Sequence, residues 1–195
     1  LEKIDIPDTI EKIGGNSFKW TKWYANQKDG VVYAGKVLYN YKGTMPKGTT
    51  VTVKAGTKGI SSFAFADEEN LKAIIIPDGV TNIGDYAFHN CPSMTTISIP
   101  DSVNSIGSFA FNGCMTLKEI AIPEGVTSID EATFYGCYSL TSISIPKSVT
   151  FIGEVVFCNC MNLSDVYYAG TPEQWNAIAI TGGNSTDNYD NYFLV

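Results

Sequence analysis

The chain has 195 residues, of which 44% are apolar and 17% charged, a balance typical of a folded domain with a substantial core. Because no apolar run approaches the roughly 18 residues of a membrane span, we expect no membrane insertion. All 13 basic residues are lysines, and the lack of a guanidinium for bidentate phosphate or guanine contacts argues against nucleic-acid recognition. The net charge of −7 is concentrated in residues 73–195, where 2 lysines face 12 acidic residues, so this half should repel anionic partners.

Residues 1–18 introduce a pattern that returns later in the chain. Its members are Ile4, Ile6, Pro7, Ile10, Ile13, Gly14 and Phe18. The next copy follows at an offset of 47 residues, one more than two periods of the 23-residue repeat described below. We predict that residues 1–18 form an N-terminal repeat.

Residues 19–50 interrupt the pattern and are rich in aromatic residues and lysine. Two β-prone runs, 31–33 and 36–41, flank Ala34-Gly35, which predicts a hairpin. The aromatic residues of this insertion either form an exposed contact surface or pack the hairpin onto the rest of the domain.

Residues 51–170 carry regular copies of a 23-residue repeat. Each copy follows Ile-x-Ile-Pro-x-x-Val-x-x-Ile-Gly-x-x-Ala-Phe-x-x-Cys-x-x-Leu. The register is marked by Pro77, Pro100, Pro123 and Pro146, by Phe88, Phe111, Phe134 and Phe157, and by Cys91, Cys114, Cys137 and Cys160. Among the departures, Asp130 replaces the glycine, Thr133 and Val156 replace the alanine, and Glu68 replaces the first cysteine.

The repeat predicts a solenoid with stacked parallel strands. Alternating runs such as residues 96–99 indicate short strands with one buried face, and parallel strands about 4.8 Å apart place equivalent residues in columns. Apolar residues at i, i+1 and i+4 between Gly84 and Cys91, and at the equivalent positions, predict one helical turn per repeat. Because one copy cannot bury its apolar face alone, stability must come from stacking, with six phenylalanines, Phe18 included, in one column.

The cysteines are spaced unlike zinc ligands, at 23 residues instead of two to four. In-register parallel side chains point the same way, which disfavours the dihedral angle of a disulfide, so we expect a buried ladder of thiols. Cys158 stands in the variable position that His89 occupies in an earlier copy, and we expect it to face solvent. His89 and Cys91 should point apart, so no nucleophile–base pair is expected.

No enzyme is apparent in the sequence. It has no Gly-x-Ser-x-Gly, phosphate-loop or His-Glu-x-x-His motif, and its acidic pairs, such as Glu68-Glu69 and Asp130-Glu131, are adjacent in sequence instead of facing each other across a cleft. We expect no catalysis, no cofactor and no metal site.

Residues 171–195 are expected to form a C-terminal cap and tail, because solenoid ends expose unpaired edges. Pro172 suits a helix start, and Trp175, Ile178 and Ile180 follow at helical spacing. Residues 184–192 have oxygen ligands at alternating positions but lack the glycine and terminal glutamate of a calcium loop. A capping strand or a loosely ordered tail is expected there.

The repeat resembles that of the BspA-like leucine-rich repeat family of bacterial surface and secreted proteins. The Ile-Pro … Val-x-x-Ile-Gly-x-x-Ala-Phe-x-x-Cys hallmark covers residues 51–170 clearly and 1–18 weakly. The resemblance implies a single right-handed leucine-rich-repeat domain of class α/β over residues 1–195. It also implies an extracellular or cell-surface location and adhesion or partner recognition, with host extracellular matrix proteins as partners.

The outward positions of successive strands are predicted to form a partner-binding strip on a concave sheet. The candidate residues are Thr96, Ser98, Glu119, Ala121, Ser142, Ser144, Asp165 and Tyr167. They are mostly small and polar, which makes a flat surface that is easily desolvated, although a merely solvated sheet face is the alternative. We expect a monomeric, non-catalytic protein-binding or adhesion module. Two alternatives stay open: a carbohydrate-binding module that uses the aromatic residues of 20–41, and a spacer that displays other domains.

Overall fold

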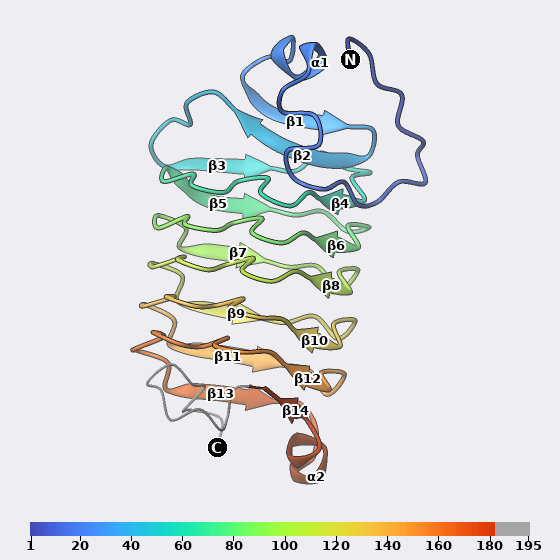
Figure 1. The fold of residues 1–195 in the computed structure, drawn as a ribbon. Coiled ribbons are helices and arrows are strands. Elements are labelled where there is room, and N and C mark those ends of the chain that lie inside the picture. Colours follow the sequence, from blue (N-terminus) through green and yellow to red (C-terminus); the bar gives the residue numbers. More distant parts are fainter. Residues whose placement is uncertain (182–195) are drawn as a thin grey trace.

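The structure is a computed structural model that describes residues 1–181. Its chain winds into a solenoid in which each coil adds one strand to each of two parallel ladders (Figure 1). The first ladder comprises β3 (Thr49–Thr52), β5 (Leu71–Ile75), β7 (Thr96–Ser98), β9 (Glu119–Ala121), β11 (Ser142–Ile145) and β13 (Asp165–Tyr168). The second comprises β4 (Gly59–Ile60), β6 (Asn82–Ile83), β8 (Ser105–Ile106), β10 (Ser128–Ile129), β12 (Phe151–Ile152) and β14 (Ala179–Ile180).

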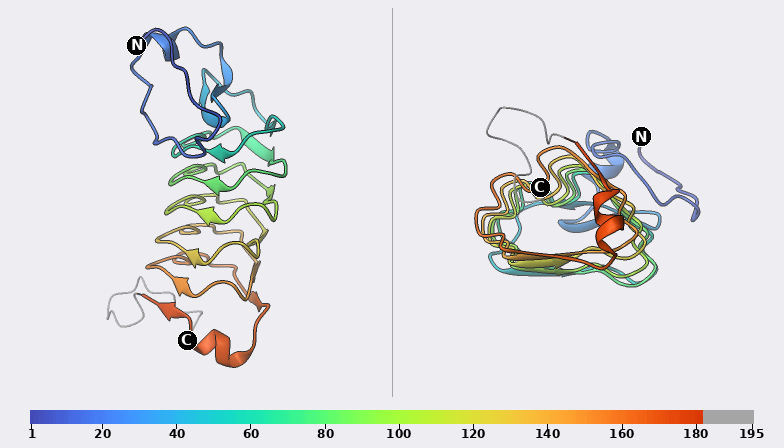
Figure 2. Two further views of the ribbon diagram at one scale, coloured as in Figure 1. Left: turned by 90° about the vertical axis from the view of Figure 1, so that its right-hand side faces the viewer. Right: turned by 90° about the horizontal axis from the view of Figure 1, so that it is seen from below.

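The register of the strands follows the 23-residue period. Ile74 pairs with Ile97 and Ile120 with Ile143, both in parallel, so equivalent residues lie in columns. Seen along its axis, successive coils overlie one another (Figure 2). The predicted solenoid of stacked parallel strands is confirmed.

A column of phenylalanine rings fills the centre of the coils. Its members are Phe65, Phe88, Phe111, Phe134 and Phe157, all buried. Neighbouring ring centroids lie 5.4 to 5.9 Å apart, and the ring planes are within 7° of parallel. Such stacking adds to the large apolar area that each ring buries. The expectation of a sixth member is wrong, because the ring of Phe18 packs instead 5.4 Å from both Trp23 and Tyr39.

The third side of each coil consists of turns, and the helical turn predicted there is wrong. Between residues 84 and 91, Ala87 N donates to Gly84 O at 3.2 Å, but Tyr86 and Asn90 adopt positive φ angles of 56° and 53°. A left-handed residue cannot continue a right-handed helix. The freed amides bond to the next coil, as Phe88 N does to Ala110 O at 2.8 Å.

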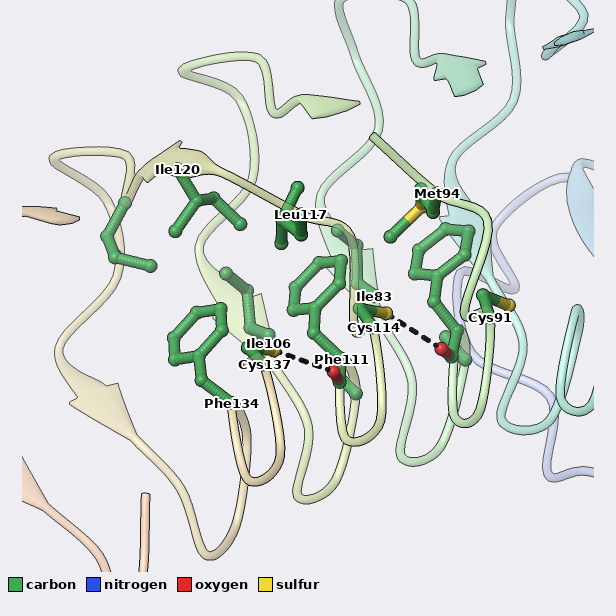
Figure 3. Packing of buried hydrophobic residues seen from close by; sticks show 14 of the residues in the cluster. Ile83, Cys91, Met94, Ile106, Phe111, Cys114, Leu117, Ile120, Phe134 and Cys137 are labelled. Atoms are coloured by element: carbon green, nitrogen blue, oxygen red, sulfur yellow. Dashed lines mark hydrogen bonds between the residues drawn. The ribbon is translucent and has the colours of Figure 1, made fainter. Parts of the chain in front are cut away.

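The cysteine ladder is buried beside the phenylalanine column (Figure 3). Each thiol donates to a carbonyl of the preceding coil, as Cys114 Sγ does to Phe88 O at 3.2 Å. Burial raises the pKa of the Cys91 thiol to about 12, so this thiol is protonated at neutral pH. None of the cysteines in the described residues forms a disulfide. The expectation that Cys158 faces solvent is wrong: it is 7% exposed, because its short side chain stays between the coils where the larger His89 and Tyr135 reach partly outward.

Residues 1–18 contain no strand and form no coil of their own, unlike the predicted N-terminal repeat. They cross the end of the second ladder, where Glu11 O accepts from Asn82 Nδ2 at 2.8 Å and Ile13 O accepts from Ser61 Oγ. The place next to β4 is taken by β2 (Val37–Lys42), whose Leu38 pairs in parallel with Ile60. The segment therefore has no free ladder position.

The predicted hairpin is present. It does not interrupt the repeats, as was expected, but forms the first part of the solenoid. β1 (Gly30–Ala34) pairs antiparallel with β2, and β2 extends the second ladder. Beside the hairpin lies a second small core around Val32, Ala34 and Tyr39. Trp23 in α1 (Lys22–Ala25) and Phe18 pack on it.

The C-terminal coil ends in a helix and a last strand. α2 (Pro172–Asn176) starts with a capping box between Thr171 and Gln174, and the Trp175 ring lies 5.2 Å from Tyr168. The helix is shorter than the spacing predicted, because residues 179 and 180 form β14 and pair in parallel with β12. The tail with alternating oxygen ligands, residues 184–192, lies outside the described residues.

Candidate functional site

The eight residues predicted to form the strip lie together on the outer face of the first ladder. Pairs of them come from β7, β9, β11 and β13, and all are exposed except Ser142, which is half-buried. Ser142 pairs with both Glu119 and Asp165, and Ser144 pairs with both Ala121 and Tyr167. The structure therefore arranges them in two columns, which we call the strand strip.

A hollow of about 380 Å³ lies on this strip. Its rim contains six of the eight predicted residues, namely Ser98, Glu119, Ala121, Ser142, Ser144 and Tyr167, and not Thr96 or Asp165. It is also lined by Ile97, Ile99 and Ile120, which the repeat pattern assigns to the core. Ile97 and Ile99 are only partly buried, as are their equivalents Val166 and Tyr168 in the last coil, whereas the equivalents in β5, β9 and β11 and directly after β5 and β9 are buried. The hollow thus combines apolar side chains with a polar rim.

The hollow lies over a break in the first ladder, and the second ladder is broken at the same coil boundary, which we call the seam. Within the described residues, β7 is not paired with β9, nor β8 with β10. Gly107 N donates to Ile83 O at 3.0 Å and Gly153 N to Ile129 O at 2.8 Å. Asp130 holds the equivalent position in the coil between those of Gly107 and Gly153, and its amide has no backbone acceptor within residues 1–181. The strand faces are therefore open at one coil boundary.

The seam coincides with Asp130, which stands where the neighbouring coils have glycine. A Cβ atom at Gly107 would lie 2.5 Å from Asp85 N, and one at Gly153 would lie 2.7 Å from Glu131 N. Real Cβ atoms do not approach backbone so closely, so glycine here allows two coils to pair. Asp130 occupies the same position with a Cβ at the boundary where the strands are unpaired. A Cβ alone does not prevent pairing, because Ser61 N and Thr181 N at the two ends of this ladder still donate to Leu38 O at 2.8 Å and to Ile152 O at 3.0 Å.

The coils separate at the seam only on their strand faces. On the turn side, Phe109 N donates to Glu131 O and Phe111 N to Thr133 O, each at 2.9 Å. In the centre, the Phe111 and Phe134 rings keep a spacing of 5.6 Å. The opening uncovers Ile97 and Ile99 without interrupting the core, and the sequence feature found at this boundary is the replacement of glycine by Asp130.

Charge and exposure define the contacts that the strand strip offers. Glu119 is the only charged residue that lines the hollow. Tyr167 is 59% exposed and offers an aromatic ring beside the serine hydroxyls. This combination suits a partner that brings apolar groups and hydrogen-bond donors.

The other candidate groups are placed as follows. The Cys91 thiol contacts the backbone oxygen of His89 at 3.9 Å, not its ring. Within residues 1–181, no three His, Cys, Asp or Glu side chains are grouped to hold a metal ion. No helix in the described chain is long and apolar enough to cross a membrane.

The aromatic residues of 20–41 mostly pack on one another. Trp23 and Tyr24 make edge contacts with the Tyr39 ring at centroid distances of 6.0 and 5.9 Å. Tyr33 and Tyr41 pack on the main core instead, and Trp20 is 91% exposed. The insertion thus offers one free indole and no extended aromatic platform.

Comparison with solved structures returns bacterial leucine-rich repeat proteins. A leucine-rich cell surface protein from Faecalibacterium prausnitzii is 30% identical with a TM-score of 0.73, and the match covers 87% of this chain and 51% of that one. A leucine-rich repeat protein from Eubacterium ventriosum is 32% identical with a TM-score of 0.63, over 68% of this chain and 36% of that one. A leucine-rich repeat protein from T. pallidum is 28% identical with a TM-score of 0.60, over 69% of this chain and 71% of that one. The chain therefore spans about half of the first protein and about a third of the second.

No curated protein matches the chain. The family model for the BspA type leucine rich repeat region matches in six copies over residues 45–182. That range holds nearly all of both strand ladders and the phenylalanine column. The chain belongs to the BspA-type leucine-rich repeat family.

Proposed function

We propose that the chain is a non-catalytic protein-binding or adhesion module of an extracellular or cell-surface bacterial protein, and that the hollow of the strand strip is its principal contact site. The observation that carries the proposal is the partial exposure of Ile97 and Ile99 at the seam. Apolar side chains in a hollow with a polar rim resemble the anchor pockets at the centre of protein interfaces. The surface location is supported by the cell surface protein of F. prausnitzii.

Two features narrow the partner. The hollow is too small to enclose more than one or two side chains, so the rest of the strip must supply the remaining contact area. The carboxylates of Glu119 and Asp165 are exposed on the strip, which favours a partner segment with lysine or arginine beside an apolar anchor. Host extracellular matrix proteins offer such segments, and the chain acts on them as a monomer.

The test is capture by immobilised matrix proteins. A panel of collagen, laminin and fibronectin should retain the wild-type chain, and Ser98→Lys with Ser144→Lys should reduce retention at least tenfold, because both lysines crowd the rim of the hollow. Thr127→Lys is the matched control, since Thr127 is exposed outside the strip. The proposal is wrong if no matrix protein retains the wild type, or if the double variant is retained as well as the control.

A further inference from the structure

A second hollow, of about 200 Å³, lies on the turn side of the solenoid and not on the strand strip. Three successive coils contribute to it, the first through His89 and Asn90, the second through Asn112 and Met115, and the third through Tyr135 and Tyr138. We propose that this edge hollow binds one ring of a neutral sugar. The proposal is independent of the protein contact on the strand strip.

The edge hollow exists because two neighbouring coils lack a side chain. One turn position has a positive φ angle in every coil, and its occupants are Asp67, Asn90, Gly113, Gly136 and Asn159. Gly113 and Gly136 are both part of the hollow. A Cβ at Gly136 would meet nothing nearer than the Gly113 backbone at 3.8 Å. The space is therefore open at the place where other coils carry a carboxylate or a carboxamide.

Polar groups with unused hydrogen-bonding capacity surround this space. The Asn112 carboxamide makes no hydrogen bond within residues 1–181, and Asn90 uses only its Nδ2, which donates to Asp67 Oδ1 at 2.9 Å. Tyr135 Oη accepts from Asn159 Nδ2 at 3.0 Å and keeps its own proton to donate. Adjacent donors and acceptors suit sugar hydroxyls, because each hydroxyl both donates and accepts.

The remaining lining determines the charge and polarity of the ligand. No Asp, Glu or Lys side chain lines the edge hollow, so nothing there compensates a phosphate, a carboxylate or an ammonium group. Met115 and Tyr138, which also line the hollow, are 41% and 38% exposed and offer apolar surface. A neutral pyranose has hydroxyls at its edge and C–H groups on its face, and the volume admits a single ring. The match is to a monosaccharide unit of a larger glycan.

His89 provides a specific probe, because it is the only histidine in the chain. In the ¹⁵N-labelled protein, the imidazole nitrogen signals should shift saturably with at least one of glucose, galactose, mannose, fucose or N-acetylglucosamine, with dissociation constants in the millimolar range. The acidic sugar N-acetylneuraminic acid should produce no shift. If no neutral sugar shifts these signals at tens of millimolar, or if the acidic sugar binds equally well, the proposal is wrong.

A filling variant tests the location. Gly136→Asn should abolish the shift and still fold, because Asn90 and Asn159 hold the same turn position at similar φ angles. Gly56→Asn is the matched control: Gly56 also has a positive φ angle, and a Cβ there meets no atom within 4 Å. The control should bind as the wild type does. A shift that persists in Gly136→Asn would place the sugar elsewhere and overturn the assignment.

Discussion

The centre of the solenoid and its strand faces differ at one coil boundary, the seam. At the seam, the phenylalanine rings stack as at every other coil boundary, while both strand ladders are interrupted. The ring stacking therefore does not depend on strand pairing at the same boundary. The middle coils pair where the close approach is a glycine, and the unpaired boundary has Asp130 there. The hollow lies where strand pairing is lost and the stacked rings still hold the coils together.

The largest effect should come from removing a ring in the central column. Phe111 is buried between Phe88 and Phe134, and Phe111→Ala should lower the free energy of unfolding by about 3–5 kcal/mol through lost burial and the cavity left behind. Urea unfolding measures this change. Trp20→Ala, at a side chain that is 91% exposed, should change stability by less than about 0.5 kcal/mol. A loss below about 1 kcal/mol in Phe111→Ala would mean that the column does not hold the coils together.

Alkaline pH tests the same interior through its thiols. Burial raises the pKa of Cys114 well above its ordinary value, whereas in the unfolded chain it is about 8.5. Below that pH the thiol is protonated in both states and its full stabilisation is present. As the pH rises, only the unfolded chain releases the proton, so this thiol should cost about 2 kcal/mol of stability between pH 8 and 10.

The measurement is urea unfolding across this pH range for the wild type and Cys114→Ala. The variant should lose about 2 kcal/mol less than the wild type between the two pH values. Equal pH dependence in the two proteins would show that the thiol is accessible to solvent in the folded state.

A smaller effect is expected from creating a second seam. In Gly107→Asp, the new Cβ would lie 2.5 Å from Asp85 N. We therefore expect β6 and β8 to separate, as β8 and β10 are separate at Asp130. The free energy of unfolding should fall by at least about 1 kcal/mol, which urea unfolding measures. Ser108→Asp adds the same charge one residue away and should cost less. If both variants are equally stable, the close approach at glycine does not control strand pairing.

Much of the fold could be predicted from the sequence, because the repeat is strict. Equivalent residues 23 positions apart must lie in columns once the strands stack in parallel, and the phenylalanine and cysteine columns follow directly. Residues 1–18 were mispredicted because their apolar pattern matches the repeat, while the ladder position that they would need belongs to β2. The turn conformation was missed because positive φ angles at residues such as Tyr86 and Phe109 are not encoded by apolar periodicity.

The candidate site was predicted in part. Strand alternation is enough to place Ser98, Ser144 and Tyr167 on one face. It cannot show that Ile97 and Ile99 are partly exposed, because their exposure depends on the loss of pairing between β7 and β9. The glycine-to-aspartate departure was visible in the sequence, but its consequence required coordinates.

The most direct test is hydrogen exchange across the coil boundaries. Thr95 N and Thr141 N each donate to the preceding coil, at 3.0 and 2.8 Å, while the equivalent amide of Lys118 has no backbone acceptor in the described chain. The amides of Lys118 and Asp130 should exchange faster than their equivalents in the neighbouring coils. In Asp130→Gly they should become protected, with a gain in stability below about 1 kcal/mol because glycine also raises the entropy of the unfolded chain. Equal protection of Lys118, Thr95 and Thr141 in the wild type would contradict the seam and the origin of the hollow above it.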